Sequence, residues 1–225
     1  MTFAERATNY LLNLDLPVNL PSGVSLIDPY KTVEVQRCVN TFYKKYFNDN
    51  NKRTFIFGIN PGRFGAGITG IGFTDPVALR TFCNIENSLG MKRELSSEFI
   101  YVMIEKYGGC ERFYKHFFIT ALSPIGFLKE GKNYNYYDNT LLQNAVEPYI
   151  ISSITQQIKL GASRDIALCL GKKNADYFSK LNSTHHFFKE IITLEHPRWI
   201  MQYRRKKVNE YVGKYMEVLN EISNK

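Results

Sequence analysis

Four short apolar segments, separated by segments of helical periodicity, constrain the fold of this chain more than any other feature. The segments are rich in β-branched and aromatic residues and span 54–59, 117–120, 165–170 and 190–194. Helical patterns occupy 3–13, 29–48, 93–107, 138–160, 172–181 and 203–223. Such strands, alternating with helices, are typical of a parallel sheet covered on both faces. The sequence therefore predicts a single three-layer α/β/α domain over residues 1–225, with a short central parallel sheet.

The composition excludes several classes of protein. With 44% hydrophobic and 14% aromatic residues, global disorder is ruled out. No apolar run approaches the roughly 20 residues of a membrane helix. Glu5 and Arg6 interrupt the apolar stretch that an export signal needs, so we expect a cytoplasmic protein. The prolines and glycine of residues 16–23 predict a loop.

The four cysteines are scattered along the chain, without a CxxC motif or a paired histidine. We therefore expect reduced thiols, and neither a metal site nor an iron–sulfur cluster nor any other cofactor.

The charge is concentrated near the carboxyl end of the chain. The formal net charge is +8, and residues 196–225 hold seven Lys/Arg against three Asp/Glu, which is half of the excess. Arg204, Arg205, Lys206 and Lys207 form one run. A run of this kind is compatible with nucleic-acid binding and also with a solvated helix face.

Polar residues follow three of the predicted strands. Asn60 comes after the first, Ser123 after the second and His196 after the last. Ligands of open parallel sheets bind beyond the carboxyl ends of the strands. These three residues are therefore expected at one edge of the sheet.

The segment from Gly58 to Phe73 contains six glycines. Its Gly65-x-Gly67-x-x-Gly70 spacing has the form of a dinucleotide fingerprint, but it begins several residues after the strand and opens no predicted helix. A phosphate-binding P-loop would need a following Gly-Lys-Ser/Thr, which is missing. A loop whose backbone approaches a ligand closely is favoured over a merely flexible one, because Phe64 and Phe73 are large aromatics.

The stretch Gly58-Ile-Asn60-Pro-Gly62-x-Phe64-Gly65, with Thr69-Gly70 and Phe73, resembles the first motif of the uracil-DNA glycosylase superfamily. The resemblance is closest to the single-strand-selective monofunctional (SMUG-type) branch. His196-Pro197 is similar to the second motif, and the resemblance covers about residues 50 to 215.

The resemblance implies roles for individual residues. Asn60 would hold the attacking water, and Gly62 and Phe64 would lie close to the base or sugar. Phe73 would stack on the extruded base, and His196 would stabilise the negative charge on the departing base. Alternatives remain open: Asn60 as a turn residue, Phe73 as core, and His196 as a helix cap or a buried histidine with its hydrogen bonds satisfied. No lysine occupies the motif as an amine nucleophile, so we expect a monofunctional enzyme.

The sequence departs from the family pattern at the residue that reads the base edge. SMUG-type enzymes carry an Asn there, and this chain has Ala121. The hydroxyl of Ser123, or less favourably that of Thr120, is expected to replace the amide, which would relax discrimination among deaminated bases. Asn133 resembles part of a family loop near the pocket and is a further candidate, with a polar surface loop as its alternative.

The segment after His196 is expected to contact DNA. Arg198 or Trp199 would fill the gap left by a flipped base, although Trp199 could equally be a core anchor. Arg204, Arg205 and Lys206 would lie near the DNA backbone at the start of the last helix.

The sequence therefore predicts a monomeric DNA glycosylase that removes uracil, and other deaminated bases, by water attack. It would lie at the nucleoid when acting on DNA. Three alternatives stay open: xanthine or hypoxanthine as the main substrate, an inactive DNA-binding module, and a nucleotide-binding protein.

Overall fold

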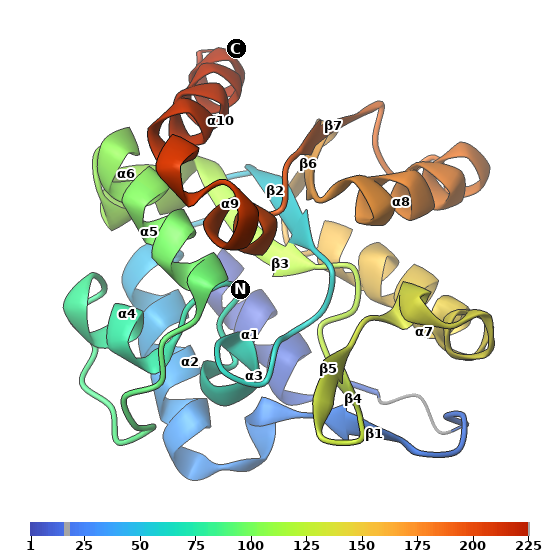
Figure 1. Cartoon of the computed structure of the whole chain (residues 1–225). Helices are drawn as coiled ribbons and strands as arrows, with labels where there is room; N and C mark the ends of the chain where they lie inside the picture. Colours follow the sequence, from blue (N-terminus) through green and yellow to red (C-terminus); the bar gives the residue numbers. More distant parts are fainter. Residues whose placement is uncertain (16–18, 225) are drawn as a thin grey trace.

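A four-stranded parallel sheet forms the centre of the computed structural model, which describes residues 1–15 and 19–224 (Figure 1). Its strands are β2 (Arg53–Gly58), β3 (Phe117–Ala121), β6 (Ala162–Leu170) and β7 (Glu190–Leu194), in the order β3-β2-β6-β7. All three strand pairs are parallel, and all six residues of β2 are buried. The predicted fold class and its four sheet strands are confirmed.

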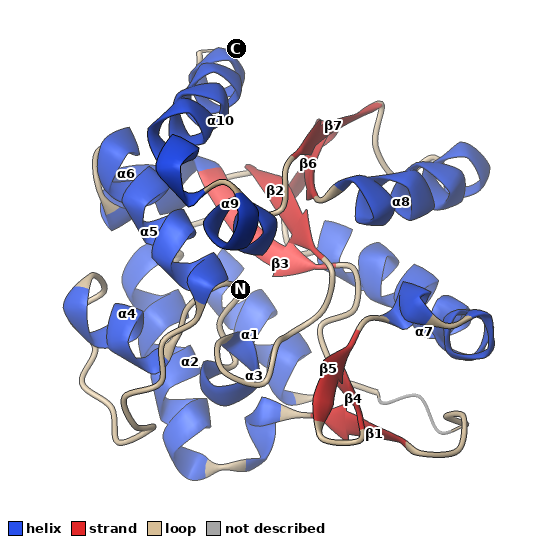
Figure 2. Ribbon diagram, in the orientation of Figure 1, coloured by secondary structure: helices blue, strands red, loops and turns tan. Residues whose placement is uncertain are grey.

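Helices cover both faces of this sheet. In Figure 2, α2 (Val33–Tyr46), α5 (Leu95–Tyr107), α6 (Cys110–His116) and α10 (Val208–Ser223) lie on one side, and α7 (Thr140–Ile158) and α8 (Lys172–His185) on the other. Helix α1 (Phe3–Leu12) contacts both α2 and α7. None of the described helices is long and apolar enough to cross a membrane.

A second, antiparallel sheet lies beside the carboxyl ends of the parallel strands. It has the order β1-β4-β5, with β1 at Val24–Ile27, β4 at Gly126–Lys129 and β5 at Lys132–Tyr134. The β4–β5 turn passes through Glu130 and Gly131, which both have left-handed backbones (φ 52° and 69°). These strands were not predicted, because three or four residues of mixed polarity carry no distinctive periodicity.

The helix boundaries differ from expectation at two places. The helix expected at 29–48 begins at Val33, because Pro29–Lys31 form a 3₁₀ turn and Thr32 caps α2. The helix expected at 203–223 begins only at Val208 as α10, after a 3₁₀ turn at Arg205–Lys207, and an unpredicted helix, α9 (Pro197–Tyr203), precedes it. Of the loop expected at 16–23, residues 16–18 lie outside the described residues.

Three further helices went unpredicted in the first half of the chain and beside β3. They are α3 (Ala66–Thr69), α4 (Pro76–Thr81) and α6. The glycine-rich segment therefore does contain one helical turn, which ends where Gly70 adopts a left-handed conformation (φ 73°).

Arg53 fixes the first residue of β2 in the interior. The residue is 1% exposed, and its guanidinium carbon lies 4.8 and 4.7 Å from the ring centroids of Phe3 and Phe47. It donates to Asp49 Oδ2 at 2.8 Å and to the Tyr114 carbonyl at 2.7 Å. A buried cation needs such partners, and here they anchor the strand that carries Asn60 at its other end.

Candidate active site

A cavity of about 950 Å³ opens at the carboxyl ends of the parallel strands. Its walls come from the segment after β2, the end of β3, the β5 strand and the start of α9. Eight of the predicted site residues line it: Asn60, Gly62, Phe64, Phe73, Asn133, His196, Arg198 and Trp199. Ser123, Arg204, Arg205 and Lys206 do not line it.

Asn60 presents an unused hydrogen-bond acceptor. Its Nδ2 donates to the Pro61 carbonyl at 3.4 Å. Its Oδ1 is buried and accepts no hydrogen bond from any described residue. Buried polar atoms are nearly always paired, so an exception at a cavity wall points to a ligand. Such an oxygen can accept a hydrogen bond from water and so orient it for attack.

His196 is both the amino-terminal cap of α9 and a cavity residue. Its Nδ1 accepts the backbone N–H of Arg198 at 3.1 Å, so the ring proton of the neutral form is on Nε2. Burial, aided by the positive charge of Arg198, lowers the pKa of His196 to about 4. The imidazole is therefore neutral at pH 7, and its Nε2–H, which donates to none of the described residues, is available to a ligand. The cap and the catalytic interpretation are compatible, because they use different ring nitrogens.

Phe73 is held in an unusual backbone conformation beside His196. Its φ is 51°, a region that costs a non-glycine residue about 1–2 kcal/mol. Its ring centroid lies 5.8 Å from that of His196, with the planes inclined by 47°. The ring also covers Gly58, where a Cβ atom would lie only 2.6 Å from Phe73 Cε2. Since the residue is only half-buried and lines the cavity, the ring is available for stacking.

Glu94 is a cavity residue that the sequence did not reveal. Its carboxyl lies against the glycine loop, and a Cβ on Gly62 would be 2.6 Å from Oε1. Burial raises the pKa of Glu94 to about 7, with nearby Asp75 adding to the rise and Arg198 opposing it. No sequence signal marks it, because it stands at the start of α5 without capping that helix.

Asn133 ties the β4–β5 hairpin to the glycine loop. Its Oδ1 accepts the backbone N–H of Arg63 at 3.0 Å, and the Arg63 side chain donates to the Gly131 carbonyl. A Cβ atom on Gly62 would be 3.3 Å from Asn133 Nδ2. The unpredicted small sheet thus helps to position the loop that follows Asn60.

The expectation that Ser123 meets the base edge is wrong in geometry. Ser123 is fully buried, and its hydroxyl donates to the Ile125 carbonyl at 2.8 Å. Thr120 and Ala121 do line the cavity. The Thr120 hydroxyl donates to Oε1 of Gln157 in α7 at 2.5 Å, a buried partner that the sequence also did not reveal.

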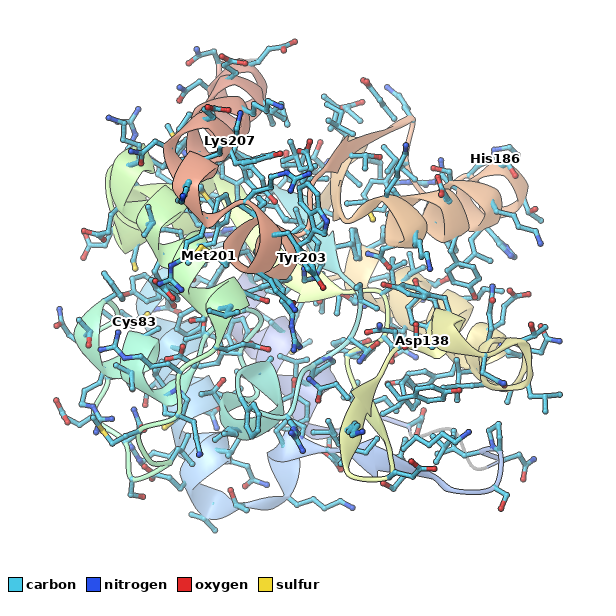
Figure 3. The ribbon with its side chains drawn as sticks, viewed as in Figure 1. Cys83, Asp138, His186, Met201, Tyr203 and Lys207 are labelled. Carbon is cyan, nitrogen blue, oxygen red and sulfur yellow. The ribbon has the colours of Figure 1, made fainter. Side chains whose placement is uncertain are left out.

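Aromatic and basic side chains form the rim of the cavity. Trp199 is 38% exposed, with Tyr211 in edge contact at 6.0 Å and the Arg204 guanidinium 5.0 Å from its ring. Arg205 is paired with Glu98 at 2.8 Å. In Figure 3, Tyr203 lies at the end of α9 in the centre of the molecule, whereas Lys207 lies beyond it, before α10.

Metal-binding geometry is not found in the part of the chain that the structure describes. No group of three or more His, Cys, Asp or Glu residues is arranged there to hold an ion, and the four cysteines are buried and form no disulfide.

The family is shown by comparison with known proteins. The sequence model of the Uracil DNA glycosylase superfamily matches residues 44–220. The chain therefore belongs to this superfamily and is a DNA N-glycosylase, a hydrolase of N-glycosyl bonds.

Within that family, the chain is similar to SMUG2 of Pedobacter heparinus. The crystal structure of that protein matches with a TM-score of 0.97 and 43% sequence identity, over 100% of both chains. No curated protein sequence matches the chain. The resemblance to SMUG-type enzymes is confirmed.

Proposed function

We propose that this protein hydrolyses the N-glycosidic bond of uracil in DNA, with Asn60 and His196 as the catalytic residues. One observation carries the proposal. The unused acceptor Oδ1 of Asn60 and the unused donor Nε2–H of His196 belong to the same cavity, with the Phe73 ring beside His196.

The chemistry requires little more than these groups. A water hydrogen-bonded to Asn60 Oδ1 forms the new C1′–O bond, and the C1′–N bond breaks with its electron pair leaving on the base. The proton that the water loses passes to solvent, from which the released base anion takes one up. The neutral His196 donates to the base oxygen on which negative charge develops, and Phe73 stacks on the extruded ring. Preorganised dipoles of this kind stabilise charge without a proton transfer at the moment of reaction.

The enzyme is proposed to be monofunctional. No lysine lies in the glycine-rich motif, although Lys132, Lys172 and Lys173 line the wider cavity. Borohydride trapping tests this point: a covalent enzyme–DNA adduct would show that an amine attacks the sugar.

A broad range of deaminated bases is proposed as substrate. Ala121 has only a methyl group, and Leu11, Tyr30 and Tyr43 also line the cavity. This space supports the larger rings of xanthine and hypoxanthine as further substrates.

DNA is proposed to cross the rim of the cavity. Arg198 and Trp199 would fill the gap left by the flipped base, while Arg204, Arg205 and Lys206, all exposed, would contact phosphates. The protein is proposed to act as a monomer of one domain, in the cytoplasm at the nucleoid.

Oligonucleotides with a single uracil, xanthine or hypoxanthine test the proposal. Incubation followed by alkali is expected to cleave each strand at the modified position. Binding to all three without cleavage would favour an inactive DNA-binding module. Cleavage of the purine substrates alone would show xanthine or hypoxanthine to be the main substrate.

A further inference from the structure

A buried hydrogen-bond network lies directly behind the cavity wall at the end of β3. Its centre is Gln157 of α7, which is 0% exposed. Gln157 Nε2 donates to the Ala121 carbonyl at 3.0 Å and to Ser153 Oγ at 2.8 Å. Gln157 Oε1 accepts the Thr120 hydroxyl at 2.5 Å, and Ser153 Oγ lies 2.7 Å from the Tyr10 hydroxyl.

Only one assignment of donors and acceptors is consistent with this network. A carbonyl oxygen can only accept, so the amide nitrogen of Gln157 must face Ala121. The amide oxygen must then face Thr120, which has to donate its single hydroxyl proton to it. The Thr120 oxygen and the Ala121 carbonyl can therefore offer nothing but lone pairs to any further partner.

This wall adjoins the place where a base would stack. Ala121 is in register with Gly58, on which the Phe73 ring lies. A Cβ on Gly58 would touch both Phe73 Cε2, at 2.6 Å, and the Thr120 carbonyl, at 3.4 Å. A base stacked on Phe73 would thus have an edge near Thr120 and Ala121, which both line the cavity.

We propose that Gln157 is a specificity-determining positioning residue, which holds the Thr120 hydroxyl oxygen and the Ala121 carbonyl as acceptors that select bases with an imino N–H. The inference rests on the proposed base excision and specifies its substrate class. Uracil and hypoxanthine carry an N–H where cytosine and adenine carry a ring-nitrogen acceptor. These acceptors would therefore favour uracil over cytosine and hypoxanthine over adenine. They would not discriminate between xanthine and guanine, because both carry the N–H.

Affinity for uncleaved DNA tests the inference separately from catalysis. The probes are oligonucleotides with one 2′-fluoroarabino-uridine or 2′-fluoroarabino-cytidine, in which the altered sugar resists hydrolysis. Gln157→Leu frees the Thr120 hydroxyl to donate and removes the support of Ala121. We expect the uracil-to-cytosine affinity ratio to fall about 10-fold, as for the loss of one hydrogen bond and the gain of a competing one.

Two further variants keep the test decisive if Gln157→Leu folds poorly. Thr120→Val removes the hydroxyl at nearly constant shape and should lower the uracil-to-cytosine affinity ratio to a similar extent. The double variant should lose less than the sum of the two single losses, because both changes break the bond between Thr120 and Gln157. Gln156→Leu is the matched control, since Gln156 is exposed and, among the described residues, its side chain bonds only to Ser152 in the same helix.

The outcomes are distinguishable. An unchanged affinity ratio in both single variants, or additive losses in the double variant, would overturn the role of Gln157. Equal weakening of both probes would show a purely structural role and overturn it as well. A wild-type protein that releases no uracil from ordinary DNA would instead overturn the proposed function.

Discussion

Gly58→Ala should impair catalysis by moving the Phe73 ring. The new Cβ atom would lie 2.6 Å from Phe73 Cε2 and 2.9 Å from Cζ. Carbon atoms in contact are usually about 3.5–4.0 Å apart, so the ring must move by about 1 Å. The methyl group cannot simply retreat, because the Thr120 carbonyl is 3.4 Å away on the neighbouring strand.

The size of this displacement gives the expected loss of activity. A misplacement of about 1 Å in an active site can lower the rate about 100-fold. Overpacking of this kind costs about 1–3 kcal/mol of stability, which leaves a folded protein to assay. We therefore expect uracil release to fall about 100-fold, far more than the loss of folded protein can explain.

Single-turnover uracil release at saturating enzyme, together with thermal unfolding, measures both effects. Gly213→Ala in α10 is the matched control, because a Cβ there meets nothing within 4 Å. It should leave the rate unchanged and raise stability by about 0.5–1 kcal/mol. A folded Gly58→Ala protein with the wild-type rate would refute the link between this glycine, Phe73 and catalysis.

Three further predictions concern titration and stability. The imidazole of His196 should stay neutral with its proton on Nε2 down to about pH 5, because its pKa is about 4; ¹⁵N NMR that shows titration near pH 6.5 would contradict this. Glu94→Gln should stabilise the protein above pH 7 by up to about 3 kcal/mol and have little effect near pH 4.5, because a pKa raised from 4.5 to about 7 means that the fold disfavours the ionised carboxyl. Unfolding curves at pH 4.5 and 8.5 that differ equally from wild type would argue against it. Arg53→Met should lower the free energy of unfolding by about 2–4 kcal/mol with little change in the rate per folded molecule, since it removes the ion-pair partner of Asp49 and the donor to the Tyr114 carbonyl. A denaturant unfolding curve that matches wild type would contradict the anchoring role of Arg53.

The parallel sheet was predictable because burial on both faces leaves a continuous apolar run, as at residues 54–59. The small antiparallel sheet was not, since its stability comes from contacts between distant segments. β1 pairs with β4 a hundred residues away in sequence, Ile27 opposite Gly126. Likewise, α9 begins at Pro197 because His196 caps its first turn, which hydrophobic periodicity does not indicate.

The ends of the predicted strands indicated where part of the site lies, but not where the side chains that follow them point. Asn60 and His196 were expected at one edge, and both line the cavity. Ser123 follows a strand as well, but its hydroxyl turns to the carbonyl two residues on, a local bond that competes with any ligand. Glu94 and Gln157 reach the wall from helices far along the chain, so only the packing of those helices brings them there.

The central claim is that this protein excises uracil through Asn60. Single-turnover release of uracil from a uracil-containing oligonucleotide, by wild type and by Asn60→Ala at equal DNA occupancy, tests it most directly. We expect release by the wild-type protein and a fall of about 100- to 1,000-fold in the variant, with unchanged affinity for DNA. A wild-type protein that binds the oligonucleotide but releases no uracil, or a variant as fast as wild type, would contradict the claim.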